Sequence, residues 1–145
     1  MLNIDVRAVW RMGQAVSATW YTSTTLVGMF FFVRETTRLT RAKCFAAAIA
    51  MTAVSWLFVA AVPLPWVASV LMDEILHGNG APVSWIFGLI VAAVIGTASS
   101  VAVIAVFGQR ITGSSVAVLF AVNLFCVGLT FYRIVTQLIG HPPQA

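Results

Sequence analysis

The sequence predicts an all-α integral membrane protein: a bundle of four transmembrane helices, with a short interfacial helix between the second and third. Two observations lead to this fold class. Hydrophobic residues make up 61% of the 145 residues and charged residues only 8%, whereas soluble domains usually carry about 25% charged residues. The chain also contains four long uncharged stretches, each close to the ~20 residues that cross a bilayer. We expect a single domain over residues 1–145.

The first predicted span covers about residues 13–33, between Arg11 and Arg34. Its first half is rich in Ser and Thr, whose hydroxyls can bond to carbonyls of their own helix and so tolerate lipid. Its larger side chains, among them Val16, Trp20 and Val27, lie on other faces than most of the polar ones. We expect these larger side chains to face lipid.

The second predicted span covers about residues 44–64 and is rich in alanine. Pro63 and Pro65 end it, because proline disfavours helix at the residue before it and suits the first turn of a new helix. The interfacial helix is expected over about residues 65–77, with Asp73 and Glu74 on its polar side. We expect it to lie along the membrane surface, anchored by tryptophan.

The third and fourth spans are predicted at about residues 83–107 and 114–138. Small residues recur every fourth position along the third span, and such a ridge lets two helix backbones approach closely in lipid. The sequence leaves open whether the ridge makes a contact within the chain or between chains. Its members, which we call the small ridge, are Gly88, Ala92, Gly96 and Ser100.

The basic residues predict the orientation of the bundle. With four spans, two short basic loops fall on one side, and such loops stay in the cytoplasm. We therefore expect the termini to lie outside, in a protein of a bacterial inner membrane. The same residues could instead contact lipid headgroups or a partner. The residues concerned are Arg34, Arg38, Arg41, Lys43 and Arg110.

Two polar stripes run along the first and fourth spans at helical spacing. Counted inward from the outer side, both lie in the outer half of the membrane. If the stripes face one another, they enclose a polar pocket. The candidate pocket residues are Gln14, Ser17, Tyr21, Thr24, Asn123, Thr130, Arg133 and Gln137, with Gly28 and Cys126 in the same two stripes.

Arg133 admits two interpretations. A charge inside a span marks a functional site by default, because hydrocarbon does not solvate it, and here it would attract an anion or an anionic lipid headgroup. Alternatively, Arg133 reaches the outer headgroups or pairs with Asp73 or Glu74, and the hydroxyls only hold helices together. The second interpretation is favoured, since Arg133 is near the end of its span.

Signatures of catalysis and of cofactor binding are missing from the sequence. No acidic residue lies inside any predicted span, which disfavours proton-coupled export and intramembrane aspartyl hydrolysis. Neither the two histidines nor the isolated Cys44 and Cys126 have a metal-ligand spacing. We therefore expect no enzyme activity, no cofactor and no metal. The net charge of +4 reports orientation in the membrane and does not imply a nucleic-acid partner.

Two hypotheses for function remain. In the first, the protein is a non-catalytic subunit that packs into a larger membrane complex and stabilises it. In the second, it is a homo-oligomeric channel or a transporter of small solutes or anions, with the two stripes lining an outward-facing vestibule. Either way we expect its partners to be the lipid bilayer and other membrane subunits or copies of itself.

Overall fold

The structure is a computed structural model that describes residues 6–60, 63–77 and 84–140. Within these ranges every regular element is helical, which agrees with the predicted all-α class. Two short segments, η1 and η2, are π-helical. In chain order the elements are α1 (Val6–Val16), η1 (Ser17–Tyr21), α2 (Thr22–Thr36), α3 (Arg41–Ser55), η2 (Trp56–Ala60), α4 (Pro63–His77), α5 (Ser84–Val106) and α6 (Gly113–Gly140).

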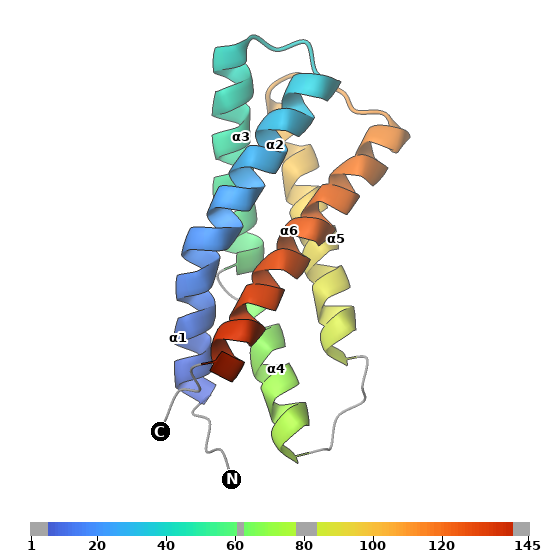
Figure 1. Ribbon diagram of the computed structural model, residues 1–145. Helices are drawn as coiled ribbons and strands as arrows, with labels where there is room; N and C mark the ends of the chain where they lie inside the picture. Colours follow the sequence, from blue (N-terminus) through green and yellow to red (C-terminus); the bar gives the residue numbers. More distant parts are fainter. Residues whose placement is uncertain (1–5, 61–62, 78–83, 141–145) are drawn as a thin grey trace.

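The first three elements form one continuous rod, drawn in blue in Figure 1. The rod passes through η1 without a break, and the backbone N–H of Thr22 donates to the carbonyl of Ser17. Spanning residues 6–36 at 1.5 Å per residue, it is about 46 Å long. The predicted first span is therefore one part of a longer helix, which ends where Thr37 turns to extended backbone.

α3 runs beside α2 in the opposite direction (Figure 1). Thr40 caps its N-terminus, with the Thr40 side chain accepting a hydrogen bond from the backbone N–H of Lys43. α3 continues into η2, and the second predicted span corresponds to these two elements.

α4 covers the segment in which the sequence predicted an interfacial helix. It begins at Pro63, where the missing N–H costs nothing in the first helical turn, and it packs against α1 and α5 rather than standing apart. Leu64, Val67 and Ala68 are fully buried along its inner face. α4 packs into the bundle because most of it is apolar. The segment Arg41–Leu71, which runs from α3 into α4, forms one hydrophobic stretch.

α5 and α6 correspond closely to the third and fourth predicted spans and pack against each other. α5 ends in a Schellman motif, in which Gly108 N–H donates to Ala105 and Gln109 N–H to Ile104. Gly108 has a φ of +74°, a conformation in which a side chain would be strained. Thr112 then caps α6 by accepting a hydrogen bond from the Ser115 N–H.

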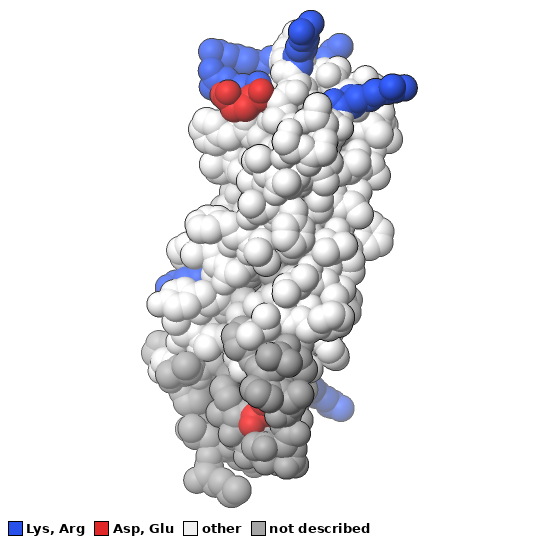
Figure 2. Space-filling model, turned by 90° about the vertical axis from the view of Figure 1, so that its right-hand side faces the viewer, with Lys and Arg blue, Asp and Glu red and all other residues white. Residues whose placement is uncertain are grey.

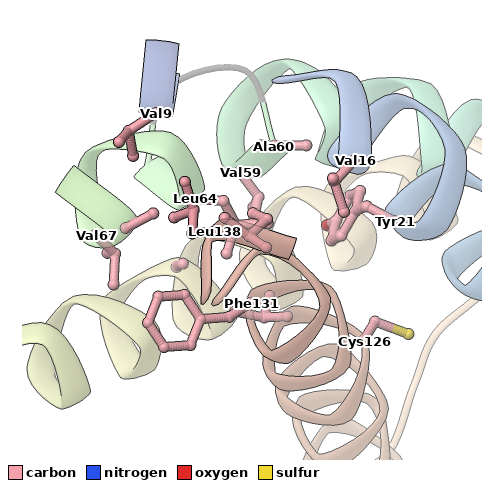
Figure 3. Close-up of a cluster of buried hydrophobic side chains, with 14 residues drawn as sticks. Val9, Val16, Tyr21, Val59, Ala60, Leu64, Val67, Cys126, Phe131 and Leu138 are labelled. Atoms are coloured by element: carbon pink, nitrogen blue, oxygen red, sulfur yellow. The ribbon is translucent and has the colours of Figure 1, made fainter. Parts of the chain in front are cut away.

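Two apolar clusters form the core. One joins α2, α3, α5 and the start of α6, around Met29, Met51 and Leu119. The other joins α1, η1, η2, α4, the first half of α5 and the second half of α6. Figure 3 shows this second cluster, in which side chains from separate elements, such as Leu64 and Leu138, meet in the same interior. The helices are therefore held together from end to end.

The outside of the bundle is suited to lipid. Within the described residues, three helices are long and apolar enough to cross a membrane: Arg41–Leu71, Ile86–Val106 and Gly113–Leu138. The first rod is not among them, because its hydroxyls lower its mean hydropathy. Figure 2 shows basic side chains crowded at one end of the molecule, above a broad uncharged belt. Large apolar side chains such as Phe125 are exposed on the outside, as is typical of helices that face lipid.

Candidate functional site

The structure buries the centres of both polar stripes. Ser17 and Tyr21 of η1 and Asn123 and Thr130 of α6 are inaccessible or nearly so. The remaining candidates are half-buried and lie towards the margins of the stripes: Gln14, Thr24, Arg133 and Gln137.

The two stripes lie against each other and pack tightly. A Cβ atom placed on Gly28 would lie 3.1 Å from Cγ1 of Val122 and 3.9 Å from Sγ of Cys126. The thiol of Cys126 is also an electrostatic neighbour of the Tyr21 hydroxyl. Side chains thus occupy the region in which the sequence predicted a pocket.

Tyr21 is the largest fully buried side chain in the bundle, and its hydroxyl has no hydrogen-bond partner. The hydroxyls of Thr25 and Ser55 are the hydrogen-bonding groups nearest to it, but neither meets the distance and angle of a hydrogen bond. The Ser17 and Thr25 hydroxyls are also buried without partners. Unpaired buried polar groups are uncommon in folded proteins, so this concentration is a distinctive feature.

Asn123 extends the polar region towards α5. Its amide nitrogen donates to the carbonyl of Leu119 at 3.0 Å, while its Oδ1 atom is buried without a partner. A Cβ atom on Gly96 would lie only 2.7 Å from that oxygen. Gly96 therefore provides the space into which the Asn123 side chain fits.

A serine pair completes this region from the other two helices. The Ser55 and Ser100 hydroxyls lie 3.4 Å apart, and Ser100 donates to the carbonyl of Gly96 at 2.8 Å. All four long helical segments thus contribute buried polar groups at one level. We call this set the polar layer: Ser17, Tyr21, Thr25, Ser55, Ser100 and Asn123.

Sequence reasoning missed Ser55 and Thr25 as members of this layer. Ser55 is one of few hydroxyls within the second span, and Thr25 lies one helical turn after Tyr21. Both hydroxyls can be seen in the sequence, but only the structure places them in the same layer as Asn123. Ser100 was assigned to packing alone, although it also bonds to Ser55.

The small ridge makes its contacts inside the chain. A Cβ atom on Gly88 would lie 2.7 Å from Cγ2 of Val67 in α4, and Gly96 faces Asn123 and Val59. Ala92 and Ser100 are fully buried. Within this chain, the small ridge therefore packs against the protein's own helices.

Arg133 lies against Trp20. Its guanidinium carbon is 4.5 Å from the centre of the indole ring, within the range of a cation–π interaction. Its Nε atom is buried without a hydrogen-bond partner. Asp73, one of the two acids considered as a partner, has a side chain outside the described residues. The described contact of the guanidinium is aromatic.

Hollows are found on the outer surface of the first rod. A groove of about 540 Å³ lies between this rod and the helix formed by α3 and η2, with Ala18, Thr22 and Trp56 among its lining residues. A second groove of about 510 Å³ is lined by Thr19, Trp20, Ser23, Thr24 and Val27. Both are open to the surroundings of the bundle.

The basic residues of the short loops lie away from the polar layer. The five basic residues expected in the short loops are all exposed and lie at the end of the molecule where α2 meets α3 and α5 meets α6. Among the described residues, no three His, Cys, Asp or Glu side chains are placed to hold a metal ion. The polar layer can form hydrogen bonds but holds no carboxylate or imidazole for acid–base chemistry.

Comparisons with known proteins place the chain in no family: no family model, no curated protein and no solved structure matches it.

Proposed function

We propose that this protein is a non-catalytic subunit of a larger membrane assembly, which crosses the membrane four times and associates through the outer surface of its first rod. The observation that carries the proposal is a surface of small and hydroxyl-bearing residues, exposed or half-buried on the outside of the first rod. Its members are Ala15, Ala18, Thr19, Thr22 and Ser23, which we call the outer ridge.

The proposal that the bundle crosses the membrane four times is supported by the matching lengths of the first rod and α6. From Arg34 back to Gln14, and from Gly113 to Arg133, the helices advance about 30 Å, which is the thickness of the hydrocarbon core. The first rod lies along α3 and α6 over this distance. We place the basic end in the cytoplasm by the positive-inside rule and the termini outside. α4 and the first turns of α1 then lie at the outer face.

The outer ridge has the chemistry of a helix contact. Ser23 donates to the carbonyl of Thr19 at 2.7 Å, and Thr19 donates to that of Ala15 at 3.3 Å. The hydroxyls are therefore satisfied within the rod, and the ridge presents small atoms to its surroundings. Small side chains allow close approach of a second helix, which gives the dispersion contacts that stabilise association in lipid.

The packed interior favours a subunit over a channel. Gly28 of the first rod packs against Val122 of α6, and Tyr21 is fully buried, so side chains fill the region in which a vestibule would have to lie. With the small ridge occupied inside the chain, the outer ridge is the best remaining surface for another subunit.

The experiment compares two substitutions of equal size on lipid-facing helices. Ala18→Leu adds bulk to the outer ridge, whereas Ala102→Leu adds the same bulk to the exposed face of α5. We expect the wild type and Ala102→Leu to purify in mild detergent as an assembly, and Ala18→Leu to run as a smaller species with the same helix content by circular dichroism.

Three outcomes would contradict the proposal. One is a wild-type protein that is monomeric in detergent and in native membranes. Another is an assembly that Ala18→Leu leaves intact. The third is a symmetric ring of copies that conducts ions in liposomes, which would support the channel hypothesis instead.

A further inference from the structure

The geometry points to a lipid-binding site at Arg133 and Trp20, in which the guanidinium holds the phosphate of a membrane phospholipid and an acyl chain lies in the groove beside Trp20. This inference depends on the bundle crossing the membrane. The groove shares Thr19 and Ser23 with the outer ridge, so each proposal is tested at a residue that the other surface does not contain: Val27 for the lipid and Ala18 for the subunit. The site is distinct from the short basic loops, which lie at the opposite end of the bundle.

The two side chains lean towards each other along the membrane normal. Side chains on a helix tilt towards its N-terminus. α6 starts at the basic end and the first rod starts at the other end, so Arg133 leans towards the membrane centre and Trp20 leans away from it. Their contact at 4.5 Å therefore holds the guanidinium near the hydrocarbon boundary instead of extending it outward.

The guanidinium at this depth needs an anion. Arg133 is about 30 Å along α6 from Gly113, close to the level at which lipid phosphates begin. The indole face stabilises its charge only in part, and its Nε atom has no hydrogen-bond partner. A planar guanidinium is well suited to a phosphate, which it can bind through two parallel hydrogen bonds.

The groove beside Trp20 is suited to a hydrocarbon chain. It has a volume of about 510 Å³ and is lined from Trp20 to Val27 along the first rod, a direction that leads from the boundary towards the membrane centre. Two of its hydroxyls are directed to the rod's own carbonyls: Thr24 donates to Trp20 at 2.8 Å and Ser23 to Thr19 at 2.7 Å. What remains towards the lipid is mainly apolar surface, from the indole of Trp20 and the hydrocarbon of the other lining side chains.

The phosphate and the chain therefore have adjacent positions that match one phospholipid of the outer leaflet. A free inorganic phosphate would share the first position but gain nothing from the groove. The two sources can be distinguished by substitutions that affect each position separately.

The test measures binding of dioleoyl phosphatidylglycerol to the full-length protein in detergent by native mass spectrometry. Arg133→Gln removes the charge, and Val27→Trp fills the groove. The matched controls are Arg110→Gln at the basic end and Val118→Trp on α6, because Val118 is 54% exposed and Val27 is 56% exposed. Trp20→Phe gives a second, milder change at the phosphate position.

We expect Arg133→Gln and Val27→Trp each to weaken lipid binding by about tenfold or more, as loss of a charge-assisted bond implies. Trp20→Phe should weaken it less, and both controls should bind as the wild type does. Inorganic phosphate at the same concentration should not displace the lipid. Equal lipid binding by wild type, Arg133→Gln and Trp20→Phe would overturn the inference. So would full displacement by inorganic phosphate, or a Val118→Trp variant that is as defective as Val27→Trp.

Discussion

Asn123 fits into the space that Gly96 leaves open, so that the amide of α6 lies directly over the backbone of α5. The distance from the Asn123 Oδ1 atom to a Cβ atom placed on Gly96 would be only 2.7 Å. The side chain has little room to move, because its amide nitrogen is held by the carbonyl of Leu119. The regular spacing of small residues along α5 thus corresponds, at Gly96, to a specific contact within the chain.

Gly96→Ala is expected to destabilise the folded protein by about 1–3 kcal/mol, the usual cost of adding a methyl group to a packed interior. The added Cβ atom would displace the Asn123 side chain. Gly128→Ala is the matched control, because a Cβ atom there meets nothing within 4 Å and alanine favours helix. Thermal unfolding in detergent, followed by circular dichroism, measures both. Equal melting temperatures for Gly96→Ala and wild type would contradict the described contact.

Gly88→Ala tests whether α4 packs into the bundle. A Cβ atom on Gly88 would lie 2.7 Å from Cγ2 of Val67, so the single substitution should lower stability by about 1–3 kcal/mol. Val67→Ala creates space at the same point and is also destabilising by itself. Because the two residues touch, the double variant should be more stable than the sum of the single effects predicts. Strictly additive effects would mean that α4 lies elsewhere, as on a free membrane surface.

Tyr21→Phe removes a buried hydroxyl that has no hydrogen-bond partner. Since such a group carries a desolvation cost of about 1–3 kcal/mol, its removal should leave stability unchanged or raise it. Thr130→Val is the comparison, because the Thr130 hydroxyl donates to the carbonyl of Cys126 at 2.8 Å; it should lower stability by about 1 kcal/mol. A loss for Tyr21→Phe as large as that for Thr130→Val would show that the Tyr21 hydroxyl is bonded.

The helices themselves could be predicted from hydropathy, because uncharged stretches, glycines and prolines mark where each one begins and ends. The stripe positions could also be predicted, since residues such as Ser17 and Tyr21 share a face at helical spacing. Spacing assigns a residue to a face of its helix, but it does not identify the neighbour. Because spacing does not say which helix lies opposite, the partners of Gly96 and of Arg133 could not be predicted.

Val16 illustrates the same limit. It was expected to face lipid, yet it is buried, because the outer part of the first rod is covered by α4 as well as by α6. Trp20 and Val27, further along the same rod, are exposed as expected. The position of α4 was the missing information, and it depends on long-range contacts such as that between Gly88 and Val67.

The central claim is that the first rod crosses the membrane, although its hydroxyls make it the least apolar of the four. Single cysteines introduced by Arg11→Cys and Arg38→Cys, in a background with Cys44→Ala and Cys126→Ala, place its two ends. A membrane-impermeant thiol reagent is applied to intact cells and to opened membranes. We predict that Arg11→Cys reacts in intact cells and that Arg38→Cys reacts only after the membrane is opened. Reaction of both from the same side would contradict the claim.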